Sequence, residues 1–314
     1  MSQSLVVGSG AIGSRVARQL VARGDEVVCV SRSGRAVPGA RSVALDAADS
    51  SALASLASGA AAIFNCANPA YHRWTSDWPP IASAVLKAAE DSGASLVTLS
   101  NLYPYGRVSG PMTPETPLLA DYAKARVRAA MWRAARQSHE AGRVRACEVR
   151  ASDFIGPDAQ GVFGLRVIPR LVAGKSVQVL GSLDQPHSWT YVDDVATTLV
   201  TCATRPDSWG RVWHAPTNRA RTQREVIDDL GGVAGVGPVR ASVVPIALLA
   251  LVGLVNPVVR ELRHTMYQFT APFIIDDSAT RAELGLTPTP WDEVLRATLA
   301  GYRSESATGS GHFI

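Results

Sequence analysis

The sequence predicts an α/β protein with a doubly wound parallel sheet, because strand-like and helix-like segments alternate along the chain. The first segment is an apolar run that breaks at Gly8, Gly10 and Gly13, spaced Gly-x-Gly-x-x-Gly, and then continues with helical spacing. Further strands are expected at residues 26–30, 42–45, 60–66, 95–99 and 145–149. Helices near residues 80–91 and 123–141 are expected to connect them.

The glycine turn carries the strongest functional signal. Gly8 permits the tight bend from strand to helix, and Gly13 lets the helix pack closely on the strand. Gly10, followed by Ala11 and Ile12, lets backbone amides at the helix N-terminus approach a pyrophosphate. Because strand, turn, helix and second strand follow one another in a βαβ-sized window, we predict a Rossmann-type dinucleotide site here.

The residues after the second strand favour NADP(H) over NAD(H). Ser31, Arg32 and Ser33 stand where a binder of the unphosphorylated cofactor usually places an acidic residue for the adenosine ribose. An arginine with neighbouring hydroxyls instead suits a ribose 2′-phosphate, although a solvated loop charge is the alternative interpretation. Asp46, after the third strand, is expected to reach the adenine.

The loop after the fourth strand is expected to line the cleft, because parallel sheets bind ligands at the carboxyl ends of their strands. Ala67 and Asn68 are expected to lie along the cofactor. Tyr71, His72 and Trp74 are candidate substrate contacts, with a structural or exposed role as the alternative for His72.

Length and composition are typical of a globular enzyme. With 314 residues, we predict a nucleotide-binding domain over 1–155 and a smaller substrate-binding or lid domain mainly over 156–303, with some segments returning to the core. Helices are expected near 162–173 and 192–203, and a disordered Ser/Gly-rich tail at 304–314. The net charge of +4 includes no Lys/Arg-rich block, so no nucleic-acid partner is expected.

Other classes of site and location are disfavoured. The four cysteines are widely separated in apolar runs, which predicts buried reduced thiols, and no His/Cys/Glu cluster has metal-ligand spacing. No basic-then-apolar leader precedes the first strand, so a cytoplasmic location is expected. The apolar segment 246–255 is too short to span a bilayer, so we expect a buried helix and no membrane partner.

Five motifs in order resemble the extended short-chain dehydrogenase/reductase superfamily, of the NAD-dependent epimerase/dehydratase type. They are Gly-Ala-Ile-Gly at 10–13, Leu-Ser-Asn-Leu-Tyr-Pro-Tyr-Gly at 99–106, Glu-Thr-Pro at 115–117, and the segments 149–157 and 189–196. The resemblance covers nearly the whole chain. It implies a Rossmann-type NAD(P)-binding fold, a small-molecule substrate and, by superfamily habit, a homodimer formed through paired long helices.

The resemblance also implies where the proton chemistry lies. The superfamily typically uses a Ser or Thr four residues before the Tyr of a Tyr-Gly pair, and a Tyr-x-x-x-Lys on the next helix. Counting back from Tyr105 puts Asn101 in the Ser/Thr position, with Ser100 beside it. Ser100, and Lys124 on the next helix, are also expected to contact the cofactor.

Two alignments of the helix remain open, and neither gives Tyr-x-x-x-Lys. One pairs Tyr122 with Arg126, and the other puts Lys124 in the Tyr position and Arg128 in the Lys position. Lys124 would act as the acid if its pKa were lowered, and Arg128 would supply fixed positive charge near the ribose. Tyr103 and Tyr122 are alternative proton donors, and an ordinary solvated helix face is the alternative for Lys124 and Arg128.

Ser152, Asp153 and Phe154 follow the sixth strand, where the superfamily contacts nicotinamide and substrate. Ser152 and Phe154 are expected on the cofactor. Asp153 is the best acidic candidate for a substrate contact, with a helix cap as its alternative. His187 and Trp189 are interpreted as architecture that supports the lid.

Together these features predict an NADP(H)-dependent oxidoreductase that transfers hydride between nicotinamide and a carbonyl or secondary alcohol of a small, largely apolar substrate. A nucleotide-sugar epimerase or dehydratase is one alternative, with Arg166, Arg170, Arg205 and Arg219 as candidate diphosphate contacts. The other alternative is a non-catalytic NADP(H)-sensing protein, favoured by the lost Tyr-x-x-x-Lys.

Overall fold

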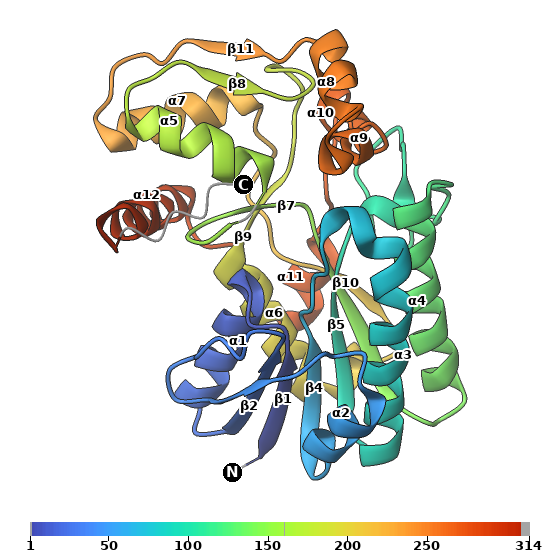
Figure 1. Ribbon diagram of the computed structural model, residues 1–314. Coiled ribbons are helices and arrows are strands. Elements are labelled where there is room, and N and C mark those ends of the chain that lie inside the picture. The colour runs from blue at the N-terminus through green and yellow to red at the C-terminus, as the bar shows by residue number, and fades with distance from the viewer. Residues whose placement is uncertain (1, 160, 309–314) are drawn as a thin grey trace.

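The computed structural model describes residues 2–159 and 161–308 and is built on a seven-stranded sheet (Figure 1). The strand order is β10-β6-β5-β4-β1-β2-β3, and every neighbouring pair is parallel. The strands are β1 (Gln3–Val7), β2 (Glu26–Ser31), β3 (Arg41–Ala44), β4 (Ala60–Asn65), β5 (Ser95–Asn101), β6 (Arg145–Ala151) and β10 (Val212–His214).

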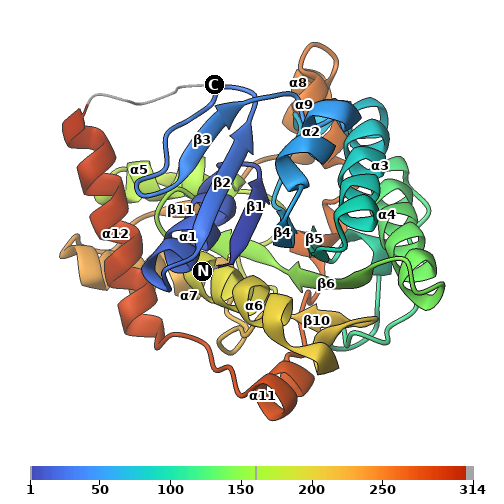
Figure 2. The same ribbon diagram turned by 90° about the horizontal axis from the view of Figure 1, so that it is seen from below.

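Helices cover both faces of this sheet (Figure 2). One face packs α1 (Ala11–Ala22) and α6 (Val192–Thr204), where Val16 and Leu199 join Phe64 in one buried cluster. The other face packs α2 (Ser50–Ala57), α3 (Trp74–Ser92) and α4 (Ala123–Glu140), where Leu53 and Trp132 join Ile63. The predicted doubly wound α/β fold is therefore confirmed.

Most predicted elements lie within two residues of the observed ones. The clearest difference is α3, which begins at Trp74 rather than near Pro80. Trp74 and Trp78 are 4% and 0% exposed, so the packing of two large rings holds the additional N-terminal turns in place. The four cysteines are free and buried, as predicted.

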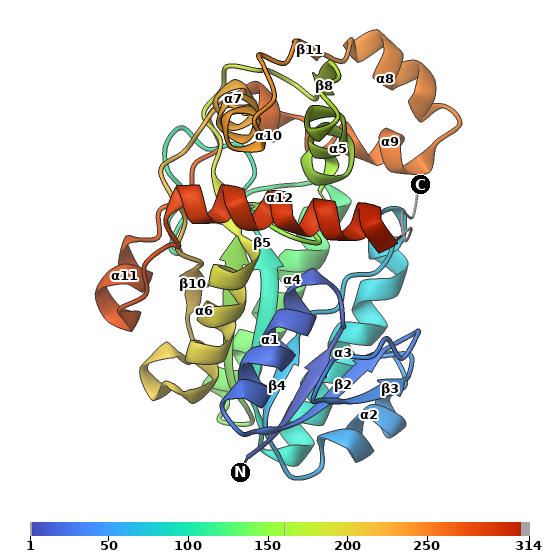
Figure 3. The ribbon, with the colours of Figure 1, turned by 90° about the vertical axis from the view of Figure 1, so that its left-hand side faces the viewer.

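The second part of the chain lies above the carboxyl ends of the strands (Figures 1 and 3). It contains the parallel pairs β7 (Asp153–Ile155) with β9 (Trp189–Tyr191) and β8 (Val177–Val179) with β11 (Ala241–Val243). The helices around them are the π-helical η3 (Phe163–Val167), α5 (Ile168–Val172), α7 (Gln223–Ala234), and α12 (Trp291–Thr308). Residues 304–308 of the expected disordered tail are helical within α12, and residues 309–314 lie outside the described residues.

Four short helices lie between β11 and α12 along the chain. They are α8 (Ile246–Gly253), α9 (Pro257–Leu262), α10 (Tyr267–Thr270) and α11 (Ser278–Leu284). The helix expected near 246–255 exists, but the prediction that it is buried is wrong, since Ile246 and Leu251 are 73% and 63% exposed. Across residues 2–159 and 161–308, no helix is both long enough and apolar enough to cross a membrane.

The glycine turn places the N-terminus of α1 at the carboxyl edge of the sheet. Gly8 has φ +103° and its amide donates to the Val30 carbonyl at 2.7 Å, joining the turn to β2. A Cβ built on Gly8 would lie 2.5 Å from the Cys66 carbonyl oxygen, and one on Gly13 only 1.8 Å from the Gly8 carbonyl oxygen. No side chain fits at either position without moving main chain.

Arg15, two residues after Gly13, joins α1 to the second part of the chain. Its side chain is 4% exposed and donates to the Pro157 carbonyl at 2.9 Å, while its Nε lies 3.0 Å from Asp193 Oδ1. The helix that presents the glycine turn therefore also anchors the loop after β7 and the start of α6.

We predict that Gly13→Ala lowers the free energy of unfolding by about 2 kcal/mol or more, because its Cβ meets main chain rather than a side chain able to move. Urea denaturation of the purified protein measures the change. The matched control is Gly232→Ala in α7, whose Cβ has nothing within 4 Å and whose stability should stay equal or rise. Equal stability of the Gly13 variant would contradict the close approach.

Candidate active site

The N-terminus of α1 has the features of a pyrophosphate cradle. Gly10 is its N-cap, in an extended conformation, and no side chain caps the helix. A Cβ at Gly10 would meet nothing within 4 Å, so the space above it is open. The first amides of the helix, beginning with Ala11 and Ile12, therefore face a region that an anion can enter.

Two buried hydroxyls at the same edge of the sheet also fit a bound cofactor. Ser100 lies at the end of β5 and Ser152 directly follows β6, where Asn101 and Ala151 are paired. Their side-chain oxygens are buried and have no hydrogen-bond partner among the described residues. Buried hydroxyls usually find a partner, so these two oxygens favour a ligand along this edge.

The residues expected around the adenosine lie in exposed loops. Arg32 and Ser33 follow β2 and are exposed, and the Ser31 hydroxyl accepts the Arg35 amide at 3.2 Å. The Ser76 hydrogen bond, the hydrogen bond and charge of Arg73 and, last, the charge of Arg32 lower the pKa of the Asp77 carboxyl in α3.

The remaining residues expected on the cofactor lie near the same edge of the sheet. Asp46 is exposed, and its carboxylate accepts the Ala48 amide at 3.0 Å. Ala67 and Asn68 follow β4, and Phe154 lies half-buried in β7.

Lys124 is the buried cation at the head of α4. It is 3% exposed, its Nζ is paired with the Glu261 carboxylate of α9, and it lies 4.4 Å from the centre of the Tyr71 ring. Asn101 ends the neighbouring strand, where its side-chain oxygen accepts the Tyr103 amide at 3.1 Å. The Asn101 side-chain amide thus keeps its own donors for another partner.

Arg128, one turn further along α4, is enclosed by aromatic rings. Its guanidinium lies 4.7 Å and 4.2 Å from the ring centres of Trp74 and Trp78, and it donates to the Leu99 carbonyl at 3.2 Å. Burial lowers the pKa of Arg128 to about 10, so it stays cationic at neutral pH. The interpretation of Lys124 and Arg128 as a solvated face is wrong. Arg126 instead is exposed and pairs with Asp121 at 2.7 Å.

A cluster of tyrosines lies next to Lys124, whose ammonium is over the Tyr71 ring. The rings of Tyr103 and Tyr122 lie 6.2 Å apart, and the Tyr122 and Tyr267 hydroxyls are separated by 3.4 Å. The Tyr71 hydroxyl lies 3.3 Å from Thr265 Oγ1. Burial raises the pKa of Tyr71, Tyr103 and Tyr122, so these phenols remain protonated near neutral pH.

Asp153 pairs with His187, although the sequence indicated only a supporting role in the lid for this histidine. Asp153 Oδ2 lies 2.8 Å from His187 Nε2, and His187 Nδ1 lies 3.0 Å from the Gln268 carbonyl. The imidazole packs between Phe269 and Phe273, with ring centres 5.1 Å and 5.3 Å away. Asp153 belongs to β7, so the helix-cap alternative for this residue is wrong.

Two other aromatic candidates separate into different roles. His72 lies in η1 (Tyr71–Arg73) and is exposed, while Trp74 is buried and donates to the Pro69 carbonyl at 3.1 Å. Tyr105 is fully buried and its hydroxyl donates to His214 Nε2 at 2.7 Å. Tyr105 is therefore a packing residue that links the loop after β5 to β10.

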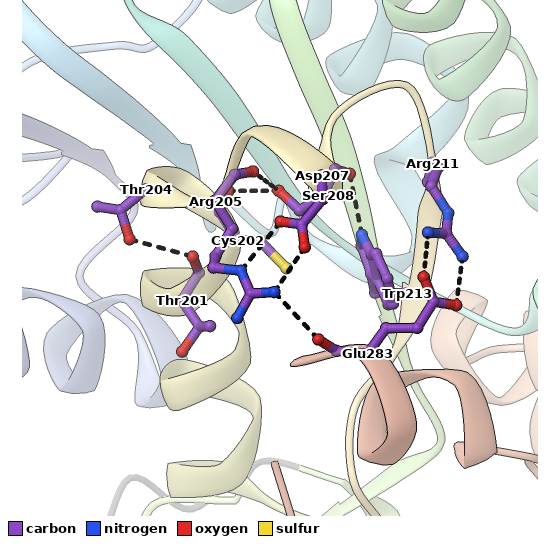
Figure 4. Close-up of polar contacts among 9 residues, drawn as sticks. All are labelled: Thr201, Cys202, Thr204, Arg205, Asp207, Ser208, Arg211, Trp213 and Glu283. Atoms are coloured by element: carbon purple, nitrogen blue, oxygen red, sulfur yellow. Dashed lines mark hydrogen bonds and ion pairs between the residues drawn. The ribbon is translucent and has the colours of Figure 1, made fainter. Parts of the chain in front are cut away.

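The four candidate diphosphate-binding arginines do not gather at one place. Arg205 directly follows the last residue of α6, in the segment that leads to β10 (Figure 4). Its side chain donates two hydrogen bonds to the Asp207 carboxylate and one to the Glu283 carbonyl at 3.1 Å. Arg219 pairs with Glu225 at 3.3 Å. Arg166 and Arg170 instead line a pocket of about 270 Å³ together with Arg240, and no acidic residue is among its described lining residues.

The seven-stranded parallel sheet and the glycine turn are those of an α/β protein of the extended short-chain dehydrogenase/reductase type. The chain belongs to the NAD dependent epimerase/dehydratase family, whose model matches residues 4–214. This confirms the resemblance inferred from the five motifs. A comparison with curated proteins gave no significant match.

Solved structures of this type share the fold over nearly the whole chain. A dTDP-glucose 4,6-dehydratase from Streptomyces venezuelae, solved with NAD, is 22% identical, with a TM-score of 0.78 over 97% of this chain and 98% of that chain. A UDP-glucose 4-epimerase from Thermotoga maritima, solved with UDP-glucose, is 17% identical, with a TM-score of 0.80 over 97% and 99%. A UDP-N-acetylglucosamine 4-epimerase from Methanobrevibacter ruminantium is 15% identical, with a TM-score of 0.79 over 97% and 99%.

We predict that His214 makes the protein less stable as the pH falls. Burial lowers the pKa of His214 to about 3 from an ordinary 6.5, so between these values the unfolded chain binds a proton that the folded chain does not. The free energy of unfolding should therefore fall by about 1.5 kcal/mol from this residue between pH 6.5 and pH 5.

Urea denaturation at both pH values tests this, with His214→Gln as the comparison. The variant can be less stable at every pH, but its stability should fall less steeply between pH 6.5 and pH 5. Parallel pH dependences for the two proteins would contradict a neutral buried imidazole.

Proposed function

We propose that this protein is an NAD(P)-dependent oxidoreductase that acts on a hydroxyl-bearing or carbonyl carbon of a nucleotide-linked sugar, as an epimerase or dehydratase does. The observation that carries the redox chemistry is the buried ammonium of Lys124 at the start of α4, which lies over the Tyr71 ring. The family membership supports the cofactor class, and the glycine cradle with its two unpartnered hydroxyls fits it.

The proposed division of labour follows from the contacts. When bound, the nicotinamide supplies or accepts the hydride. When a carbonyl is reduced, the Lys124 ammonium gives a proton to the substrate oxygen and becomes a neutral amine. In the reverse direction that amine takes the proton back, and Glu261 holds Nζ in place. The Asn101 side-chain amide donates to the same oxygen, and Arg128 supplies fixed positive charge next to β5. The protonated phenols of Tyr103 and Tyr122 orient the substrate rather than accept its proton.

Two observations favour a nucleotide sugar over the small apolar substrate suggested by the sequence. The similar structures include a dTDP-glucose dehydratase and a UDP-glucose epimerase, aligned over 97% of this chain. Arg166, Arg170 and Arg240 form a cationic pocket in the second part of the chain, suited to a diphosphate. The second candidate substrate is a small carbonyl compound that packs against aromatic side chains. The adjacent rings of Tyr71, Trp74 and Tyr103 favour it.

We predict that the protein turns over UDP- or dTDP-glucose with bound NAD(P), and that Lys124→Met lowers kcat by about 100-fold or more while cofactor affinity changes little. Product formation is followed by NMR and cofactor binding by calorimetry. Arg126→Met, on the exposed face of the same helix, is the matched control and should remain fully active.

The outcomes separate the candidates. Turnover of NADPH with aliphatic or aromatic ketones, and none with nucleotide sugars, would favour the second candidate. Normal turnover of the Lys124 variant would shift the proton transfer to a tyrosine. Cofactor binding without turnover in either panel would favour a sensing protein.

We further propose that the cofactor is NADP(H), since Arg32 and Ser33 are exposed at the end of β2 and no acidic residue stands among residues 31–35. Arg32→Asp is predicted to weaken NADPH binding about tenfold or more, because a charge-assisted hydrogen bond to the 2′-phosphate is lost, while NADH binding is kept. Calorimetric titration measures both affinities, with Arg35→Asp as the control. Equal weakening of both cofactors would argue against a 2′-phosphate site.

A further inference from the structure

The α8–α9 hairpin, residues 246–262, carries most of the exposed large apolar side chains among the described residues. Seven of its large apolar side chains are exposed: Ile246 73%, Leu248 46%, Leu251 63%, Val252 37%, Leu254 75%, Val255 86% and Val258 38%. Figure 3 shows α8 and α9 at the outer edge of the second part of the chain. An exposed apolar surface of this extent marks an interaction site.

The exposure surrounds most of α8 rather than one stripe. At about 100° per residue, Ile246, Leu248, Leu251 and Val252 span about 240° of the helix circumference. Only Leu249 and Gly253 face inward, and Gly253 packs closely on the main chain of Arg260. A helix that is apolar all round is typical of a protein core or of lipid, whereas one flat protein partner covers a single face.

The unpaired charges around the hairpin are of one sign, since Glu261 of α9 is paired with Lys124. No acidic residue stands between Asp229 and Glu261, and the charged residues that flank the hairpin are Arg240 and Arg260, followed by Arg263. These three arginines form no ion pair among the described residues, and Arg240 and Arg260 are exposed. Cations beside an apolar tip match the headgroups and acyl chains of an anionic lipid surface.

We propose that the α8–α9 hairpin docks the protein on an anionic lipid bilayer by inserting α8 into one leaflet. The eight residues of α8 extend about 12 Å, far less than the ~30 Å hydrocarbon core, so the hairpin lies in the interface and does not cross it. The sequence-based expectation of no membrane partner rested on a buried helix, and the exposed side chains remove that reason.

The docking surface adjoins the candidate active site. Glu261, which follows Arg260 in α9, pairs with Lys124, and Thr265 bonds to Tyr71. The docked protein would thus hold its substrate cleft close to the lipid headgroups. This proposal does not depend on the proposed function, because the exposed apolar side chains of the hairpin belong neither to the cofactor cradle nor to the pocket that Arg240 lines.

The test is flotation of the full-length protein with phosphatidylcholine vesicles, with and without phosphatidylglycerol. The wild-type protein should float with the anionic vesicles, and binding should weaken with added salt. Leu251→Gln combined with Leu254→Gln should reduce the bound fraction about tenfold, because both side chains are exposed and their apolar contact with lipid is lost.

Leu119→Gln combined with Leu165→Gln is the matched control, since these leucines are 76% and 56% exposed elsewhere on the molecule and should float like the wild type. Thermal unfolding verifies that both variants fold. Absence of wild-type binding to anionic vesicles would overturn the proposal. Light scattering provides a second test. If the wild-type protein is a dimer with or without lipid, and the hairpin variant is a monomer, the proposal is overturned and the hairpin binds a second copy of this chain instead.

Discussion

The close approach of Gly13 to the Gly8 carbonyl is the constraint on which the rest of the structure depends. A Cβ at Gly13 would lie 1.8 Å from that oxygen, so only glycine lets α1 pack closely on the turn that joins it to β1. This seating directs the first amides of α1 at the carboxyl edge of the sheet. It also fixes Arg15, whose bonds to Pro157 and Asp193 hold the second part of the chain over the same edge.

The candidate site contains two buried cations, Lys124 and Arg128, and each needs a group that compensates its charge. A buried ammonium needs a partner, and Lys124 obtains one from Glu261, carried by a helix far along the chain. Arg128 instead is held by the faces of two tryptophans and one carbonyl, which keep it cationic without an acid. In the proposed mechanism the mobile proton lies on the lysine and the fixed charge on the arginine, one helical turn apart.

Sequence patterning predicts what is local. The strands, the glycine turn and the helix that carries Lys124 follow from periodicity and turn chemistry. Whether Lys124 or Tyr122 faces the cleft depends on how α4 rotates against Trp74 and Trp78, which no local pattern contains. The partners Glu261 and His187 are 137 and 34 residues from Lys124 and Asp153, so only the folded chain reveals those pairs.

The environment of the apolar hairpin is a second feature that local sequence patterning does not predict. A helix without a polar face predicts complete burial or contact with lipid, and periodicity does not distinguish the two. The fold leaves α8 only Leu249 and Gly253 as inward residues, and Gly253 allows α9 to pack directly against α8. The sheet core closes without α8, so the apolar side chains do not support the fold. In the proposed docking, these side chains are stabilised by contact with a surface outside the chain. The positive charge of the flanking arginines requires that surface to be anionic.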